Sequence, residues 1–116
     1  MLHPELELLL EIQDLRTLRR DISGEEYAAA GIPVSVDAVA DRLSERIAER
    51  EAALSPRTKA RYERIARRRD RVVAPVLHGV CYGCFVQVPT STGRDKERNS
   101  ELRVCESCGR FIYYTD

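Results

Sequence analysis

Hydrophobic residues recur at steps of three and four along the first part of the chain, the spacing of one face of an α-helix. Pro4 suits a first helical turn, because its missing N–H has no partner there. The pattern therefore predicts a helix over residues 4–22. Its apolar stripe is formed by Leu8, Ile12, Leu15, Leu18 and Ile22.

A second helix is predicted over residues 36–54, after a break at residues 23–34 that contains Gly31 and Pro33. Ser35 suits the N-cap of this helix. Because each helix has one apolar face and is too short to be stable alone, we expect the two to pack as an antiparallel hairpin. Such a hairpin buries little surface, which leaves self-association or a partner open. The stripe of the second helix is Val36, Val39, Leu43, Ile47 and Leu54.

Ser55 and Pro56 mark the start of a third helix, predicted over residues 56–71. Tyr62 and Ile65 are expected to face inward. The other face of this helix carries a stripe of basic residues at helical spacing. These are Arg57, Arg61, Arg64, Arg68 and Arg71.

The remainder of the chain favours short extended segments. Residues 72–80 are β-branched and contain Pro75 and Gly79, which predicts an extended linker or an edge strand. Short strands are predicted near 85–88, 101–104 and 110–114, with an exposed polar loop at 89–100. We therefore expect an α+β fold that is mainly α, in which residues 1–71 form the helical region and residues 72–116 form a small three-stranded region.

All four cysteines lie in this second region, in the pattern Cys81-x2-Cys84-x20-Cys105-x2-Cys108. Two residues between paired cysteines allow a tight turn to aim both sulfurs at one metal ion. Gly83 and Gly109 are expected to ease these turns by adopting positive φ. We predict one structural zinc ion, so that residues 72–116 form a small three-stranded, four-cysteine zinc ribbon. Four thiolates would fill the coordination sphere of the ion, which argues against a catalytic metal.

Other uses of the four cysteines are less compatible with the sequence. The same sulfur cage also suits iron, which stays an alternative to zinc. Two disulfides do not fit a reducing compartment, and no βαβ pattern supports a redox pair. His78 is read as a linker residue rather than a ligand, because four cysteines are already present, and His3 as a terminal, exposed residue.

The 116-residue chain has no formal net charge, but its charge is unevenly distributed. Residues 1–55 carry 6 basic and 12 acidic residues, whereas residues 56–116 carry 13 basic and 7 acidic residues. Such asymmetry bears on partners rather than on fold. The sequence has no apolar run of the length that a bilayer requires, and its start does not read as a signal peptide. We expect a cytoplasmic protein.

The segments YERIARRRDRVVAPVLHGVCYGCFVQVP and ELRVCESCGRFIYY resemble the bacterial four-cysteine zinc-ribbon family that carries an N-terminal coiled-coil hairpin. The likeness covers residues 55–115 well, and LLEIQDLRTLRRDI more weakly. The hairpin is shorter here than is usual in that family. The resemblance implies a zinc-stabilised adaptor, since members are linked to sigma-factor binding, to flagellar or secretion-related regulation, and to nucleic-acid binding. At the level of architecture only, the chain also resembles DksA-type proteins, which enter a polymerase channel.

Two functional hypotheses follow, and neither is an enzyme, because no catalytic constellation is present. The first is an adaptor that binds a protein of the transcription or regulatory machinery. The alternative is a nucleic-acid-binding module, in which basic side chains meet phosphates and ribbon aromatics stack on bases. The aromatics are Phe85, Phe111, Tyr113 and Tyr114. The basic contacts would be the helical stripe together with Arg94, Lys96, Arg98, Arg103 and Arg110.

Overall fold

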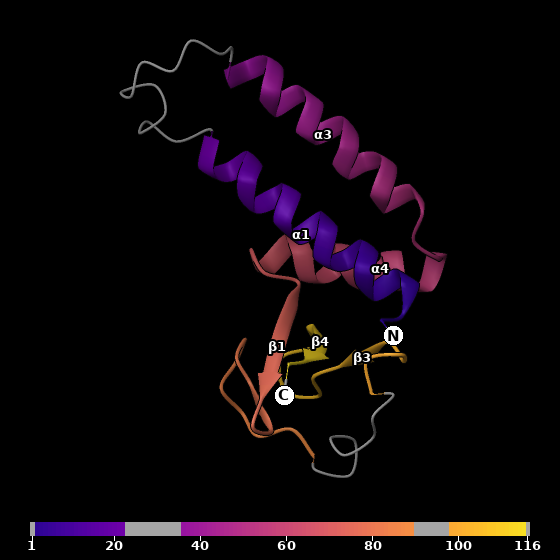
Figure 1. The fold of residues 1–116 in the computed structure, drawn as a ribbon, viewed down its shortest axis with the longest axis vertical. Helices are drawn as coiled ribbons and strands as arrows, with labels where there is room; N and C mark the ends of the chain where they lie inside the picture. The colour runs from indigo at the N-terminus through magenta and orange to yellow at the C-terminus, as the bar shows by residue number, and fades with distance from the viewer. Residues whose placement is uncertain (1, 23–35, 90–97, 116) are drawn as a thin grey trace.

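The computed structural model describes residues 2–22, 36–89 and 98–115, which form three helices and a small mixed sheet (Figure 1). The helices are α1 (Pro4–Ile22), α3 (Val36–Ala52) and α4 (Pro56–Arg68). The strands are β1 (Val73–Leu77), β2 (Val80–Cys81), β3 (Arg103–Val104) and β4 (Phe111–Tyr114). None of these helices combines the length and the apolar character that crossing a bilayer requires.

Helices α1 and α3 lie side by side and run in opposite directions (Figure 1). The span of α1 matches the predicted helix, whereas α3 ends at Ala52, two residues before the predicted end. Leu54 is nevertheless buried, because it closes the turn into α4 and packs on the helical core. The turn at 23–34, the Ser35 cap and the Val36 side chain lie outside the described residues, so the hairpin connection stays a prediction.

The helical core lies where α1, α3 and α4 meet the sheet. Leu6, Leu9 and Ile12 of α1 are fully buried there. Leu18, which we predicted in the stripe, is 46% exposed. Two helices alone cannot enclose every apolar position, so the pair of α1 and α3 leaves part of its stripe uncovered. The remaining core members are Ile47, Leu54, Tyr62, Val72, Val73 and Phe111.

Helix α4 begins as predicted and ends early. The Ser55 Oγ accepts a hydrogen bond from the Thr58 N–H at 3.5 Å, and Pro56 occupies the first turn. The helix ends at Arg68, because Arg69 already has extended backbone angles (φ −138°, ψ 143°). Arg71 therefore lies outside the helix, and the arginine stripe is one member shorter than predicted.

The sheet has four strands in the order β2-β1-β4-β3, rather than the three that we predicted. The segment expected to be a linker or edge strand is the inner strand β1. It pairs parallel with β4, with Val73 opposite Phe111. Pro75 is tolerated because its nitrogen, like its carbonyl, faces the short β2. That carbonyl accepts from the Tyr82 N–H at 3.0 Å, just where β2 ends.

Alternation along β1 and β4 divides the apolar residues between two cores. Phe111 and Tyr113 pack on the helical core, whereas Ile112 and Tyr114 belong to a second core beside the cysteines. The first core includes residues from both predicted regions, 1–71 and 72–116. The helices and the sheet therefore pack against each other directly. The second core consists of Ala74, Val76, Cys81, Val88, Cys105, Ile112 and Tyr114.

Candidate metal centre

The two Cys-x-x-Cys turns bring the four cysteine sulfurs together, with all Sγ atoms within 4.8 Å of one another. The Sγ atoms of Cys81 and Cys108 are 3.9 Å apart, and those of Cys84 and Cys105 are 3.7 Å apart. A tetrahedral ion with metal–sulfur bonds of about 2.3 Å would separate its sulfurs by about 3.8 Å. The cluster can therefore hold one metal ion with four sulfur ligands.

The two turns, called here the first knuckle (residues 81–86) and the second knuckle (residues 105–110), have the same backbone design. The Phe85 N–H donates to the Cys81 carbonyl at 2.6 Å, and the Gly109 N–H donates to the Cys105 carbonyl at 2.8 Å. Phe85 has φ +62° and Gly109 has φ +78°. The second knuckle thus uses glycine where the backbone is left-handed, as predicted, whereas the first knuckle uses Phe85.

Gly83 is not among the residues with positive φ, so our explanation for it was wrong. Its role is to leave space. A Cβ at this position would lie 2.9 Å from both Cδ and Nη1 of Arg110, and 3.0 Å from the Ala74 Cβ. The first knuckle can pack against the Arg110 side chain only because residue 83 has no side chain.

Burial and hydrogen bonding act differently on the cysteines. Burial raises the pKa of the Cys81 thiol, although hydrogen bonds from the N–H groups of Gly83 and Cys84 act to lower it. Burial also raises the pKa of Cys105 to about 12. Burial opposes ionisation of Cys108 too, but hydrogen bonds from the backbone and side chain of Arg110 lower its pKa to about 7. A metal cation would supply the missing positive charge for the buried thiolates.

Arg110 is 8% exposed, so it does not suit the exposed phosphate contact that we predicted for it. Its Nε donates to the Arg71 carbonyl at 2.9 Å, and its Nη1 is buried without a hydrogen-bond partner among the described residues. A guanidinium in this place offsets the charge of a four-thiolate centre, which carries two negative charges when it holds a divalent ion.

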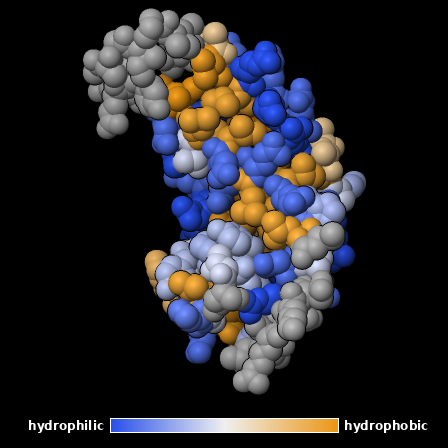
Figure 2. All heavy atoms as spheres, in the orientation of Figure 1, coloured by the Kyte–Doolittle hydropathy of each residue, from blue (hydrophilic) through white to orange (hydrophobic). Residues whose placement is uncertain are grey.

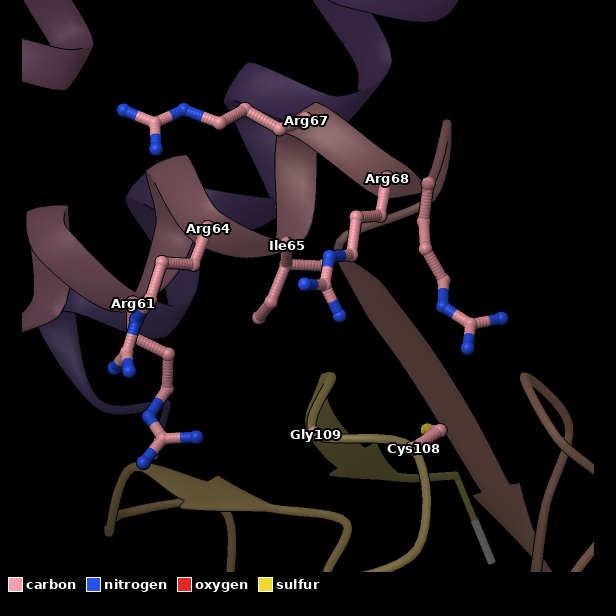
Figure 3. A pocket seen from close by; sticks show the side chains of 8 residues that line it. Arg61, Arg64, Ile65, Arg67, Arg68, Cys108 and Gly109 are labelled. Carbon is pink, nitrogen blue, oxygen red and sulfur yellow. The ribbon is translucent and has the colours of Figure 1, made fainter.

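Five arginines border a cavity of about 460 Å³ between α4 and the second knuckle, called here the arginine groove. In Figure 3, Arg61, Arg64 and Arg68 extend from the side of α4 on which Cys108 and Gly109 lie, whereas Arg67 extends away from that side. No acidic residue within the described ranges lines the groove. The sequence stripe identified three of its arginines and missed Arg67 and Arg69. The full lining is Arg61, Arg64, Ile65, Arg67, Arg68, Arg69, Cys108 and Gly109.

The other basic residues that we singled out lie apart from this groove. Arg57 and Arg71 are exposed but do not line it. The Arg98 guanidinium lies over the Tyr114 ring, 4.8 Å from its centroid, and Arg103 pairs with Glu101. Arg94 and Lys96 fall outside the described residues. Exposed His78 has φ +52° in the β1–β2 turn, which supports its reading as a connecting residue.

Three polar residues that the sequence did not point to join segments that lie far apart in the chain. Gln13 Oε1 accepts from the N–H groups of both Val72 and Val73, each at 2.8 Å. The Asn99 side chain donates to the Tyr114 carbonyl at 2.8 Å and accepts from the Tyr114 N–H at 2.7 Å. The third is Glu5, whose carboxylate accepts from the Ser55 N–H and the Thr58 hydroxyl. Local periodicity carries no signal for such long-range contacts.

Comparison with known proteins bears on the fold. No protein-family model matches the chain, and no curated protein matches its sequence. Among solved structures, the chain is similar to CT398 from Chlamydia trachomatis, with a TM-score of 0.56 and 25% sequence identity. The match covers 69% of this chain and 34% of CT398, so it extends over about a third of that protein.

Proposed function

We propose that the four cysteines bind one structural zinc ion, and that the protein is a non-enzymatic adaptor for a protein of the transcription or regulatory machinery. Four sulfur ligands leave no open position on a tetrahedral ion, so the metal would hold the two knuckles together rather than react. Cytoplasmic thiols stay reduced, which suits metal binding there. Function then depends on surfaces that the metal keeps in place.

The observation that carries the adaptor proposal is an exposed apolar cluster on the first knuckle, formed by Tyr82, Phe85 and Val86. Their exposed fractions are 44%, 73% and 44%, and the two rings lie 5.8 Å apart. Phe85 also occupies a left-handed backbone position that disfavours a side chain. Packing against the described residues, Tyr82 among them, leaves most of the Phe85 side chain exposed, whereas contact with a protein partner would explain a large aromatic residue there.

The helical part offers a second apolar surface of the same kind. Figure 2 shows an interrupted band of hydrophobic residues along the helical region, with hydrophilic residues beside it. Leu18 is the large hydrophobic residue of the helices that is most exposed among those described. We assign the partner contact to the first knuckle, because three exposed apolar side chains gather there, and use Leu18 as its comparison.

The test is capture of partners from an extract of the source cells, with the purified polymerase of the same cells as a defined probe. Phe85→Ser with Val86→Ser should abolish capture of the partner and leave zinc content unchanged. Leu18→Ser, which alters an apolar residue of similar exposure to Val86, is the matched control. If the same proteins are captured by the double variant and the wild type, the first knuckle is not the contact surface.

A second candidate function, nucleic-acid binding, is favoured by the arginine groove. Arg61, Arg64 and Arg68 border a groove whose lining holds no carboxylate within the described ranges, which provides a site for phosphates. Against this, the acidic first half of the chain cancels the positive charge of the second half, so the chain has no net charge. The volume of the groove is about 460 Å³, so it would hold only a short segment of a nucleic-acid backbone.

A mobility-shift assay with single-stranded RNA at two salt concentrations tests this candidate. Arg64→Ala with Arg68→Ala should weaken binding and reduce its salt dependence, by a slope of about 0.7 for each phosphate that is no longer neutralised. Arg57→Ala with Arg71→Ala removes the same charge outside the groove and should have a smaller effect. Equal effects of the two pairs, or no binding at low salt, would exclude a role for the groove in nucleic-acid binding.

A further inference from the structure

A second cavity, called here the edge groove, lies beside the outer strand β3 and has a volume of about 590 Å³. One wall is formed by residues 86–89 and the other by residues 102–107. Its size falls in the range of sites that bind small molecules. Its apolar lining consists of Val86, Val88, Pro89, Leu102, Val104, Ile112 and Tyr114.

The main chain of β3 has one edge without a neighbouring strand among the described residues. In the β3–β4 ladder, Arg103 lies opposite Ile112 and Val104 lies opposite Phe111. The Cys105 N–H donates to the Arg110 carbonyl at 2.8 Å, which identifies the hydrogen-bonded pairs of this ladder. Because such pairs alternate along an antiparallel ladder, the N–H and carbonyl of Val104 face away from β4.

The opposite wall has a similar but interrupted edge. Hydrogen bonds from Cys81 N–H to the Val86 carbonyl and from Val88 N–H to the Gly79 carbonyl flank the bridge between Val80 and Gln87. Gln87 therefore directs its own N–H and carbonyl away from β2. Two residues later, Pro89 has no N–H to donate. A regular ladder can continue at β3 but not at this wall.

We propose that the β3 edge accepts an extended segment of a partner protein as an additional strand. The main chain of Val104 would pair with the segment, and apolar side chains at alternate positions of the segment would fill the edge groove. This inference rests on the proposed adaptor function. Val86 belongs both to the edge groove and to the exposed cluster of the first knuckle, so one partner can occupy both.

The chemistry of the edge groove favours a peptide over a polyanion. Arg103 is its only basic lining residue among those described, and it pairs with Glu101 at 3.1 Å. Glu106 adds an acidic side chain to the lining. A phosphate chain would therefore meet little positive charge here, whereas an apolar strand meets both apolar walls and the outward-facing main-chain groups of Val104.

The experiment uses the complete zinc-loaded protein and a random library of twelve-residue peptides displayed on phage. We expect selected peptides to alternate apolar and polar residues. In the complex, amide hydrogen exchange at Val104 should slow at least tenfold, with little change at Phe85. Methylating the peptide nitrogens that face β3 should weaken binding at least tenfold. Methylating the alternate nitrogens, which face away, is the matched control and should change the affinity less than threefold.

The inference would be overturned by selection of no peptide, by equal loss of affinity for both methylated series, or by unchanged exchange at Val104 in the complex. Slow exchange at Val104 in the protein alone, together with a dimer in sedimentation, would also overturn it by assigning the edge to a second copy of this chain. None of these results affects capture of a partner through Phe85 and Val86, so the strand inference can fail while the adaptor function holds.

Discussion

Phe85 and Gly109 occupy the same position in the two knuckles, immediately after the second cysteine of each pair, and both have left-handed backbone angles. A Cβ at Gly109 would meet no atom within 4 Å, so glycine is required there by φ alone. The first knuckle tolerates the less favourable residue and exposes 73% of it. This asymmetry points to contact with another molecule rather than to folding as the reason for Phe85.

Substitutions at these two positions should change stability by similar amounts. Left-handed angles cost a residue with a side chain about 1–2 kcal/mol relative to glycine. We expect Gly109→Ala to destabilise the zinc-loaded protein by about 1 kcal/mol, and Phe85→Gly to be about 1 kcal/mol more stable than Phe85→Ala. Urea unfolding followed by circular dichroism measures both differences. If Phe85→Ala is the more stable of the pair, the left-handed backbone angle does not disfavour a side chain at this position.

The close packing of Gly83 against the Arg110 side chain predicts that a larger residue at position 83 destabilises the fold by overpacking. Gly83→Ala places a methyl group 2.9 Å from the Arg110 side chain, and such overpacking costs about 1–3 kcal/mol. In an Arg110→Ala background the cost should fall, because only the Ala74 contact remains. The coupling is measured by a double-mutant cycle of unfolding free energies. Equal costs in both backgrounds would mean that Arg110 does not require the glycine.

Gln13 should contribute more to the stability of the fold than its position on a helix suggests. It satisfies the N–H groups of Val72 and Val73, two residues with no exposed surface. Gln13→Leu leaves both donors without a partner and should cost about 2–4 kcal/mol. Gln13→Glu keeps the acceptor oxygen and should recover most of this loss. The comparison of the two unfolding free energies is the measurement, and equal losses would show that the helix tolerates any change at this position poorly.

Glu5 makes the free energy of unfolding depend on pH. Burial of its carboxyl opposes ionisation, but hydrogen bonds from Thr58 and Ser55 outweigh it and lower the pKa below 4.5. A carboxyl with a lower pKa in the folded state stabilises the fold while it is ionised, and this contribution disappears as pH falls through the folded pKa.

The stability difference between wild type and Glu5→Gln should therefore be present at pH 7 and shrink below about pH 4.5. Urea unfolding across this range measures it, and Thr58→Val, which removes one of the donors, should reduce the effect. Metal loss in acid is common to all three proteins and cancels in the differences. A difference that stays constant down to about pH 3 would contradict the assignment.

The sequence predicted local features well and long-range pairings poorly. Helix α1, the Ser55 cap and the four clustered cysteines follow from patterns within a few residues. By contrast, β1 pairs in parallel with β4, nearly forty residues later, and no local pattern specifies such a partner. The hydrogen bonds from the Val72 and Val73 N–H groups to Gln13, 59 and 60 residues away in the sequence, are equally beyond any local pattern.

For the candidate functional surfaces, too, the sequence predicted what depends on local spacing and missed what depends on long-range packing. Helical spacing identified Arg61, Arg64 and Arg68, whereas Arg69 lines the same groove from beyond the end of α4, where helical spacing no longer applies. Arg110 looked like an exposed basic residue and is buried beside the cysteines. Its role depends on the packing of two knuckles that lie more than twenty residues apart in the sequence.

Metal analysis of the purified protein tests the central claim most directly. We predict close to one zinc ion per chain, and loss of that ion together with the ribbon structure in Cys105→Ser, because the four sulfurs form one closed site. Cobalt bound in place of zinc should show the spectrum of a tetrahedral four-thiolate centre. Clearly less than one equivalent of zinc after refolding with the metal, or iron in the protein as isolated, would contradict the account.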